Sequence, residues 1–112
     1  MNRTNPMNAG EVLQKGDFLM SPNGQWKATL QADGNLLIYN MSTSWRTEIA
    51  PSDGSHLKVE PNGDVVIYNN NEAKWRTNTG TPSADVKCTF KLTDEGKLVV
   101  SHASAVKWSK PK

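Results

Sequence analysis

The chain of 112 residues contains little cysteine, little histidine and no long apolar run. Its one cysteine, Cys88, has no partner for an internal disulfide, and we interpret it as a buried thiol and not as a reactive one. The two histidines, His56 and His102, lack neighbours at the spacing of metal ligands and are interpreted as ordinary surface or turn residues. We therefore expect no metal and no cofactor.

Charge and hydropathy exclude two further classes of partner. Thirteen Lys and Arg oppose eleven Asp and Glu, and no basic cluster is interleaved with aromatics, so no nucleic-acid surface is expected. No apolar run approaches the ~20 residues that cross a bilayer, which argues against membrane insertion. The first ten residues lack the apolar core of a secretory signal. We expect a soluble protein, cytoplasmic as written, with unconventional secretion to mucus or the extracellular space left open.

Turn signals recur at short intervals along the whole chain. Pro-Asn-Gly, Asp-Gly and Glu-Gly groups separate short segments in which apolar and polar residues alternate, as in half-buried strands. No window of a dozen residues has a helical apolar stripe. The length suits one domain, 1–112, with residues 1–9 as an N-terminal arm. The pattern predicts an all-β sandwich, barrel or prism.

One of these segments is written three times. The repeats are centred on residues 31–39, 60–68 and 93–101, and their glycines, Gly34, Gly63 and Gly96, are 29 and 33 residues apart. A fold made of equivalent supersecondary units is indicated, since no single unit can bury its apolar face alone. The apolar register is kept in every copy, whereas the polar register decays in the third. We therefore predict a repeated ligand-binding module.

A tryptophan follows each copy: Trp45, Trp75 and Trp108. Three units about a pseudo-threefold axis would bring these indoles together near the centre, where we expect them to contribute core area and not a binding platform. In each unit a strand enters, turns at the glycine and returns. Trp26 lies outside this pattern, so an exposed position remains open for it.

The polar register of the first copy offers a mixture of groups suited to a sugar. Gln31, Asp33, Asn35, Leu37 and Tyr39 supply two carboxamides, a carboxylate, a phenol and an apolar patch along one strand face. Vicinal hydroxyls both donate and accept hydrogen bonds, and the C–H face of a sugar needs apolar contact. Catalysis is not indicated, because there is no paired carboxylate and no base beside a nucleophile.

The first copy matches in full the Gln-x-Asp-x-Asn-x-(aliphatic)-x-Tyr signature, and the chain thereby resembles the bulb-type (snowdrop-like, monocot) mannose-binding lectins. The resemblance runs from Gly10 to Trp108 and includes the Trp-Arg-Thr that follows the first two repeats. The opening Gly16-Asp-Phe-Leu-Met-Ser is most similar to the lily-type lectins of fish skin and gill mucus. Plant members usually carry an internal disulfide, which this chain cannot form.

Membership would imply a β-prism of three four-stranded antiparallel sheets, metal-independent recognition of α-mannose and high-mannose glycans, and a homo-oligomer, a dimer or tetramer. It would also assign Gln31, Asp33, Asn35 and Tyr39 to sugar hydroxyls, and Leu37 to the apolar face of the sugar. A non-enzymatic lectin with a role in innate defence is the function that this resemblance favours.

The other two copies depart from the signature. The second has Glu60 for Gln and exchanges the next two residues, so that Asn62 and Asp64, with Val66 and Tyr68, would form a weaker second site. In the third copy Lys97 replaces Asn and Ser101 replaces Tyr, which predicts a silent site. Two alternatives stay open: a structural or protein-interaction β-prism scaffold with vestigial sugar pockets, and an antibacterial toxin on the same fold.

Overall fold

The computed structural model describes residues 2–49 and 55–111, which form strands and turns without a helix. None of these residues therefore belongs to a helix long and apolar enough to cross a membrane. The strands are β1 (Met7–Asn8), β2 (Val12–Gln14), β3 (Phe18–Met20), β4 (Lys27–Leu30), β5 (Leu36–Asn40), β6 (Ser42–Arg46), β7 (Ser55–Val59), β8 (Val65–Asn69), β9 (Glu72–Arg76), β10 (Cys88–Leu92), β11 (Leu98–His102) and β12 (Ala105–Lys110).

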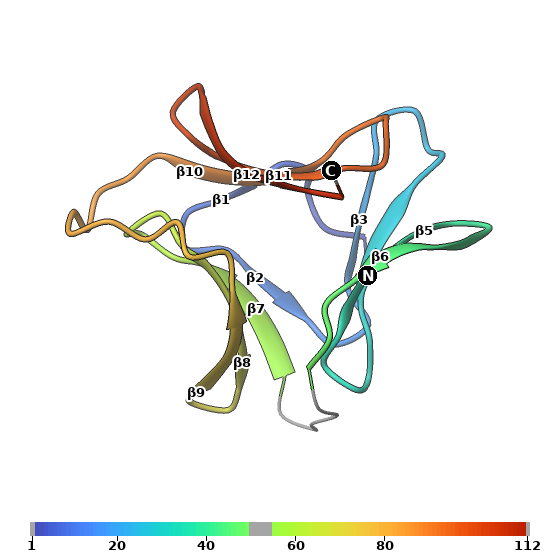
Figure 1. Cartoon of the computed structure of the whole chain (residues 1–112), viewed down its shortest axis with the longest axis horizontal. Coiled ribbons are helices and arrows are strands. Elements are labelled where there is room, and N and C mark those ends of the chain that lie inside the picture. The colour runs from blue at the N-terminus through green and yellow to red at the C-terminus, as the bar shows by residue number, and fades with distance from the viewer. Residues whose placement is uncertain (1, 50–54, 112) are drawn as a thin grey trace.

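The strands form three four-stranded antiparallel sheets, which are the three sides of a prism (Figure 1). Unit 1 is the sheet β3-β4-β5-β6, unit 2 is β2-β7-β8-β9 and unit 3 is β1-β10-β11-β12. Each repeat contributes three consecutive strands to its own sheet. The fourth strand of each sheet is β3 in unit 1, β2 in unit 2 and β1 in unit 3, all from the first 20 residues of the chain. The predicted β-prism is confirmed.

The apolar register of each repeat faces the interior, because alternate side chains of a strand point to opposite faces of the sheet. Leu36 and Ile38 of β5, and their equivalents in β8 and β11, are fully buried. The strands on either side of each turn glycine form where the alternation predicts them, as β5 does at Leu36–Asn40 after the turn at Gly34. Alternation therefore located these strands and their buried faces.

The N-terminal segment, which the sequence suggested would extend as an arm over residues 1–9, instead completes the sheet of unit 3. Met7 in β1 is 1% exposed and pairs with Phe90 of β10. The Asn5 carboxamide donates to the carbonyls of Met20 (2.8 Å) and Leu92 (2.9 Å), and its oxygen accepts from Leu92 N (3.0 Å). Asn5 thus joins units 1 and 3, which local sequence pattern does not reveal.

The three tryptophans of the repeats meet as predicted. Ring centroids of Trp45, Trp75 and Trp108 lie 5.7–6.1 Å apart, and every pair is arranged edge to face. Such pairs contribute about 0.5–1.5 kcal/mol each beyond the burial of their area. All three indoles are half-buried and pack against the buried cluster that lines the prism. Each unit therefore contributes one indole to a cluster of three aromatic rings.

Neighbouring units also contact the glycine turns. The Trp26 ring packs so closely on Gly96 that a Cβ there would lie 2.6 Å from it, and the Nε2–H of His102 donates to the Gly63 carbonyl (2.7 Å). Trp26 is half-buried and packs against the core. The exposed position that the sequence left open for it is therefore not the one observed. His102 ends strand β11 and is half-buried, so it is not the surface or turn residue expected, and its bond to Gly63 joins unit 3 to unit 2.

Alanine substitutions at two glycines should separate backbone strain from this packing. Gly16 and Gly96 both have φ near +80°, at +87° and +79°, but a Cβ at Gly16 meets no atom within 4 Å. We expect Gly16→Ala to lower the free energy of unfolding by about 1–2 kcal/mol through left-handed strain alone. Gly96→Ala should cost about 1–3 kcal/mol more, because the indole must move. Equal losses in urea denaturation would contradict the packing role of Trp26.

Candidate functional site

A shallow trough of about 300 Å³ crosses the outer face of unit 1. Three of the five residues expected to bind a sugar line it, namely Gln31, Leu37 and Tyr39. Thr29 of β4 and the residues of the β5–β6 hairpin tip, Met41, Ser42 and Thr43, complete its lining. Leu37 lies opposite Thr29 in the sheet and remains half-buried, so its side chain offers an accessible apolar surface.

Asp33 and Asn35 lie at the turn that precedes β5. The Asn35 N–H donates to Asp33 Oδ1 (2.9 Å), which fixes the turn through a side chain, as Asp and Asn commonly do. Asp33 is half-buried, and its Oδ2 makes no hydrogen bond within the described part of the chain. This carboxylate oxygen remains able to accept from a ligand.

Asn35 has a structural role that the sequence signature does not suggest. Its Oδ1 accepts from the Thr47 hydroxyl (2.9 Å) and from Ile49 N (3.0 Å), while its Nδ2 donates to the Ile49 carbonyl (3.2 Å). The side chain is 7% exposed. These bonds fasten the segment that follows β6 to the start of β5. Only the second Nδ2 hydrogen is left, so Asn35 can offer a ligand one donor and no acceptor.

The other polar side chains that line the trough form no hydrogen bond within the part of the chain that the structure describes. The Gln31 carboxamide and the Tyr39 hydroxyl form no hydrogen bond to any residue in ranges 2–49 and 55–111. Thr29 Oγ1 is buried and unpartnered, which buried hydroxyls usually are not. Opposite Tyr39, Lys27 directs its ammonium over the Phe18 ring (4.5 Å). The face of unit 1 therefore has an apolar residue, Leu37, among polar side chains whose hydrogen-bonding groups are unpaired within the described residues.

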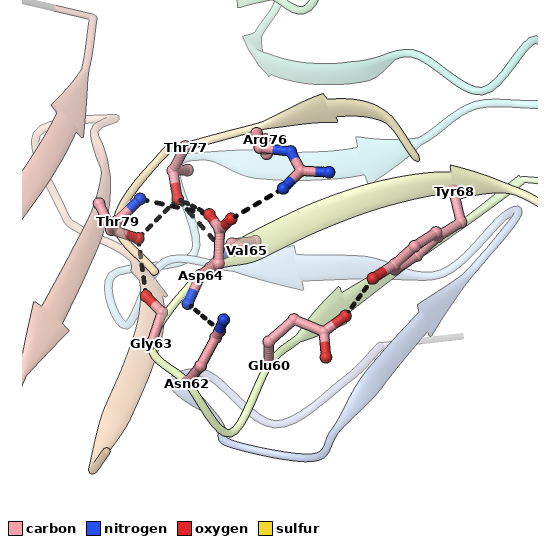
Figure 2. Close-up of polar contacts among 9 residues, drawn as sticks. All are labelled: Glu60, Asn62, Gly63, Asp64, Val65, Tyr68, Arg76, Thr77 and Thr79. Atoms are coloured by element: carbon pink, nitrogen blue, oxygen red, sulfur yellow. Dashed lines mark hydrogen bonds and ion pairs between the residues drawn. The ribbon is translucent and has the colours of Figure 1, made fainter. Parts of the chain in front are cut away.

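Unit 2 repeats the turn and the fastening with the two residue types exchanged (Figure 2). Asp64 N donates to Asn62 Oδ1 (3.1 Å), as Asn35 N does to Asp33. Asp64 Oδ1 then accepts from Val65 N, from the Thr77 hydroxyl and from Thr79 N, at 3.0–3.3 Å, and Oδ2 lies 3.8 Å from Arg76. Placing Asp64 where unit 1 has Asn35 preserves these structural hydrogen bonds. It removes the amide donor at that position, because a carboxylate only accepts hydrogen bonds.

The outer face of unit 2 holds a similar trough, of about 250 Å³, but two of the polar side chains that line it are bonded to each other. The Tyr68 hydroxyl donates to Glu60 Oε1 (2.5 Å), and the His56 ring stacks on Tyr68 with centroids 5.2 Å apart. The hydrogen bond to Glu60, followed by burial, raises the pKa of Tyr68 to about 12. Val66, the equivalent of Leu37, is 2% exposed. His56 is therefore part of this stacked face and not an isolated surface residue.

Unit 3 keeps neither arrangement. Lys97 occupies the position of Asn35, and Lys110 the position of Thr47, so the side-chain fastening of the other two units cannot form. Val99 and Ser101, the equivalents of Leu37 and Tyr39, are each 8% exposed. The two residues of unit 3 that correspond to Leu37 and Tyr39 are therefore buried, whereas those of unit 1 are accessible.

A larger hollow, of about 520 Å³, lies beside Cys88 at the start of β10. Burial, followed by the charge of Asp64, raises the pKa of the Cys88 thiol to about 11. The thiol is thus protonated at neutral pH, which fits the buried, unreactive cysteine expected from the sequence. No group of three or more His, Cys, Asp or Glu in residues 2–49 and 55–111 is arranged to hold a metal ion.

Known proteins share this fold and much of this sequence. No family model matches the chain. B-type lectin plumieribetin of Scorpaena plumieri is 36% identical over 109 residues, which cover 96% of each chain. The chain belongs to the B-type, or bulb-type, lectin family. It is accordingly a carbohydrate-binding lectin and not an enzyme, as the sequence predicted.

Solved structures agree with this assignment. A monomeric monocot mannose-binding lectin from Gastrodia elata superposes with a TM-score of 0.87 at 26% identity, covering 97% of this lectin and 98% of that chain. The mannose-specific agglutinin of snowdrop (Galanthus nivalis) bulbs, solved with methyl α-D-mannoside, superposes with a TM-score of 0.81 at 26% identity, covering 97% of each chain. The β-prism is therefore a shared framework.

The bond between Glu60 and Tyr68 has a measurable consequence at high pH. In the folded lectin Tyr68 keeps its proton to about pH 12, whereas an ordinary tyrosine ionises near 10.0. The resulting stabilisation is complete below pH 10 and is lost as the pH rises towards 12. We expect Glu60→Gln to lower the pKa of Tyr68 in an ultraviolet absorbance titration, with Tyr68→Phe identifying its signal. An unchanged titration in Glu60→Gln would show that the hydrogen bond is absent in solution.

Proposed function

We propose that the trough of unit 1 binds α-mannose and the mannose residues of high-mannose glycans. In this assignment the Asp33 carboxylate accepts from sugar hydroxyls, Gln31 and Tyr39 donate and accept, Asn35 donates through Nδ2, and Leu37 contacts the C–H face of the ring. Recognition at an extracellular surface in innate defence is part of the same proposal.

One contrast between units carries the assignment. Gln31 and Tyr39 in unit 1 have no hydrogen-bond partner among the described residues, whereas their equivalents Glu60 and Tyr68 bond to each other. The apolar residue between them is accessible in unit 1, at Leu37, and buried in unit 2. Since unsatisfied polar groups around an apolar patch are what a sugar pairs with, unit 1 is the best-equipped site.

The same contrast ranks the other units. A sugar at unit 2 has to break the bond between Glu60 and Tyr68 before it can use either group, and it finds no amide donor at Asp64. We therefore propose Glu60, Asn62, Asp64, Val66 and Tyr68 as a weaker second site. Unit 3, with Val99 and Ser101 buried, should not bind.

The relatives support the choice of sugar. The snowdrop agglutinin is mannose-specific and was solved with methyl α-D-mannoside, and the Polygonatum cyrtonema lectin, 21% identical, was solved with a monomannoside. The full Gln31-to-Tyr39 signature in unit 1 supports carrying this ligand over to the present chain.

Binding to a glycan-coated surface would require more than one site. A single shallow site should bind a monosaccharide with a dissociation constant on the order of millimolar, about −4 kcal/mol. The homo-oligomer expected from the family, a dimer or tetramer, would raise avidity. In this structure the C-terminal strand β12 pairs with β11 of its own chain and is not exchanged with another copy.

The charge of Asp33 should matter more for binding than for folding. Asn62 already makes the equivalent turn bond in unit 2, so Asp33→Asn should keep the turn and shift the melting temperature little. Replacing a charged acceptor by a neutral one should weaken methyl α-mannoside binding by about 1 kcal/mol, or about fivefold, in calorimetry. The reciprocal Asn62→Asp in unit 2 is the matched control and should leave the affinity of the stronger, unit 1 site unchanged. Wild-type affinity in Asp33→Asn would contradict the assignment.

Mannose binding should persist without divalent cations. Calcium-dependent sugar sites use several oxygen ligands that converge on the ion, whereas no carboxylate of the described residues lines the trough and the single carboxylate assigned to the site, Asp33, lies at the turn before β5. The measurement is retention on mannose–agarose in EDTA, followed by elution with free mannose. Loss of retention that calcium restores would refute the direct mode of binding, and the lack of any retention would favour the scaffold alternative.

A further inference from the structure

Met41 stands apart from the other apolar side chains in the described ranges. It is the residue between β5 and β6, its exposure is 102%, and it lines the trough of unit 1 together with Tyr39. Of the described large apolar side chains, it shares this exposure only with Val106, at 64% on β12. A thioether held fully in water beside a sugar site has no internal packing role.

The backbone at Met41 makes this placement costly. Its φ is +64°, in the left-handed region that long side chains rarely adopt. The first residue after β8 and after β11 has the same conformation, at Asn70 (φ +56°) and Ala103 (φ +54°). Asparagine is among the residues best suited to this region, so unit 2 shows a less strained choice at the equivalent position. Unit 1 keeps methionine there despite the strain.

The position of Met41 fits the next residue of a glycan chain. It follows Tyr39 by two residues and lies at the hairpin tip between β5 and β6, at the end of the trough away from the turn at Asp33. A sugar at Gln31, Leu37 and Tyr39 therefore leaves the hairpin-tip end of the same trough free. Ser42 and Thr43 line that end and add hydroxyl groups beside the thioether. An adaptable apolar group with neighbouring hydroxyls suits the C–H face of a second pyranose ring.

We propose that Met41 is a specificity-determining residue that contacts the second sugar of an α-linked mannose glycan bound at unit 1. The inference rests on the proposed function, since it requires a first mannose in the trough. It predicts a preference for disaccharides over the monosaccharide, with the preference residing in one side chain at the hairpin tip.

Met41→Asn tests this inference by giving unit 1 the residue of unit 2. The variant should melt about 2–5 °C higher, because asparagine tolerates the left-handed backbone better. Methyl α-mannoside should bind with an affinity within about twofold of wild type. The better of α1,3- and α1,6-mannobiose should lose about fivefold in calorimetry, because the ring loses its apolar contact. A gain in stability together with a loss of disaccharide affinity cannot arise from misfolding.

Two controls accompany this variant. Asn70→Met places the same strained methionine in unit 2 and should lower the melting temperature without changing either affinity. Val106→Ser removes the other large apolar side chain that is exposed among the described residues. It should change neither the monosaccharide nor the disaccharide affinity, which would exclude non-specific apolar binding of glycans.

Three outcomes would overturn the inference. In the first, Met41→Asn keeps the wild-type ratio of disaccharide to monosaccharide affinity. In the second, the monosaccharide and disaccharide affinities fall equally, or the disaccharide affinity falls because the variant has a lower molecular mass in light scattering. A lower mass would make Met41 a contact between copies of the chain. In the third, wild type binds neither mannoside, which contradicts the proposed function itself and this inference with it.

Discussion

The edge-to-face contact of Trp45, Trp75 and Trp108 joins one residue from each of the three sheets. Each sheet has one apolar face, and none can bury that face alone, so the three must close around a common interior. The N-terminal segment completes this closure, with Met7 buried and Asn5 bonded to both unit 1 and unit 3. With the inner faces committed to packing, the outer faces are free to differ.

The outer faces show how three equivalent units divide structure from binding. Asn35 with Thr47, and Asp64 with Thr77, fasten the chain after the third strand of the repeat, so this signature position serves the fold as well as a ligand. The partners of Glu60 and Tyr68 are each other, whereas Gln31 and Tyr39 have none among the described residues. Binding capacity in this lectin therefore depends on which polar groups the fold leaves unpaired.

Sequence alone predicted the parts that depend on local pattern. Alternation and the glycine turns located the first two strands of each repeat, and the spacing of the tryptophans predicted their meeting. It did not reveal β1 or β2, which have two and three residues and are held by pairing with distant strands. The roles of Asn5, Trp26 and Asn35 depend on contacts 12 or more residues away in the chain, which periodicity cannot encode. The threonine of each Trp-Arg-Thr was the available signal for the fastening at Asn35.

The central claim is that one framework presents three related faces, and that unit 1 binds best because Gln31 and Tyr39 have no hydrogen-bond partner among the described residues, whereas Glu60 and Tyr68 of unit 2 bond to each other. The most direct test is a crystal structure of the lectin soaked with methyl α-mannoside across a range of concentrations. The account predicts that the sugar first occupies the trough at Gln31, Leu37 and Tyr39. At higher concentration it should reach unit 2 only where Glu60 and Tyr68 have separated. Sugar bound at unit 2 with that bond intact, or at unit 3 while unit 1 stays empty, would contradict the account.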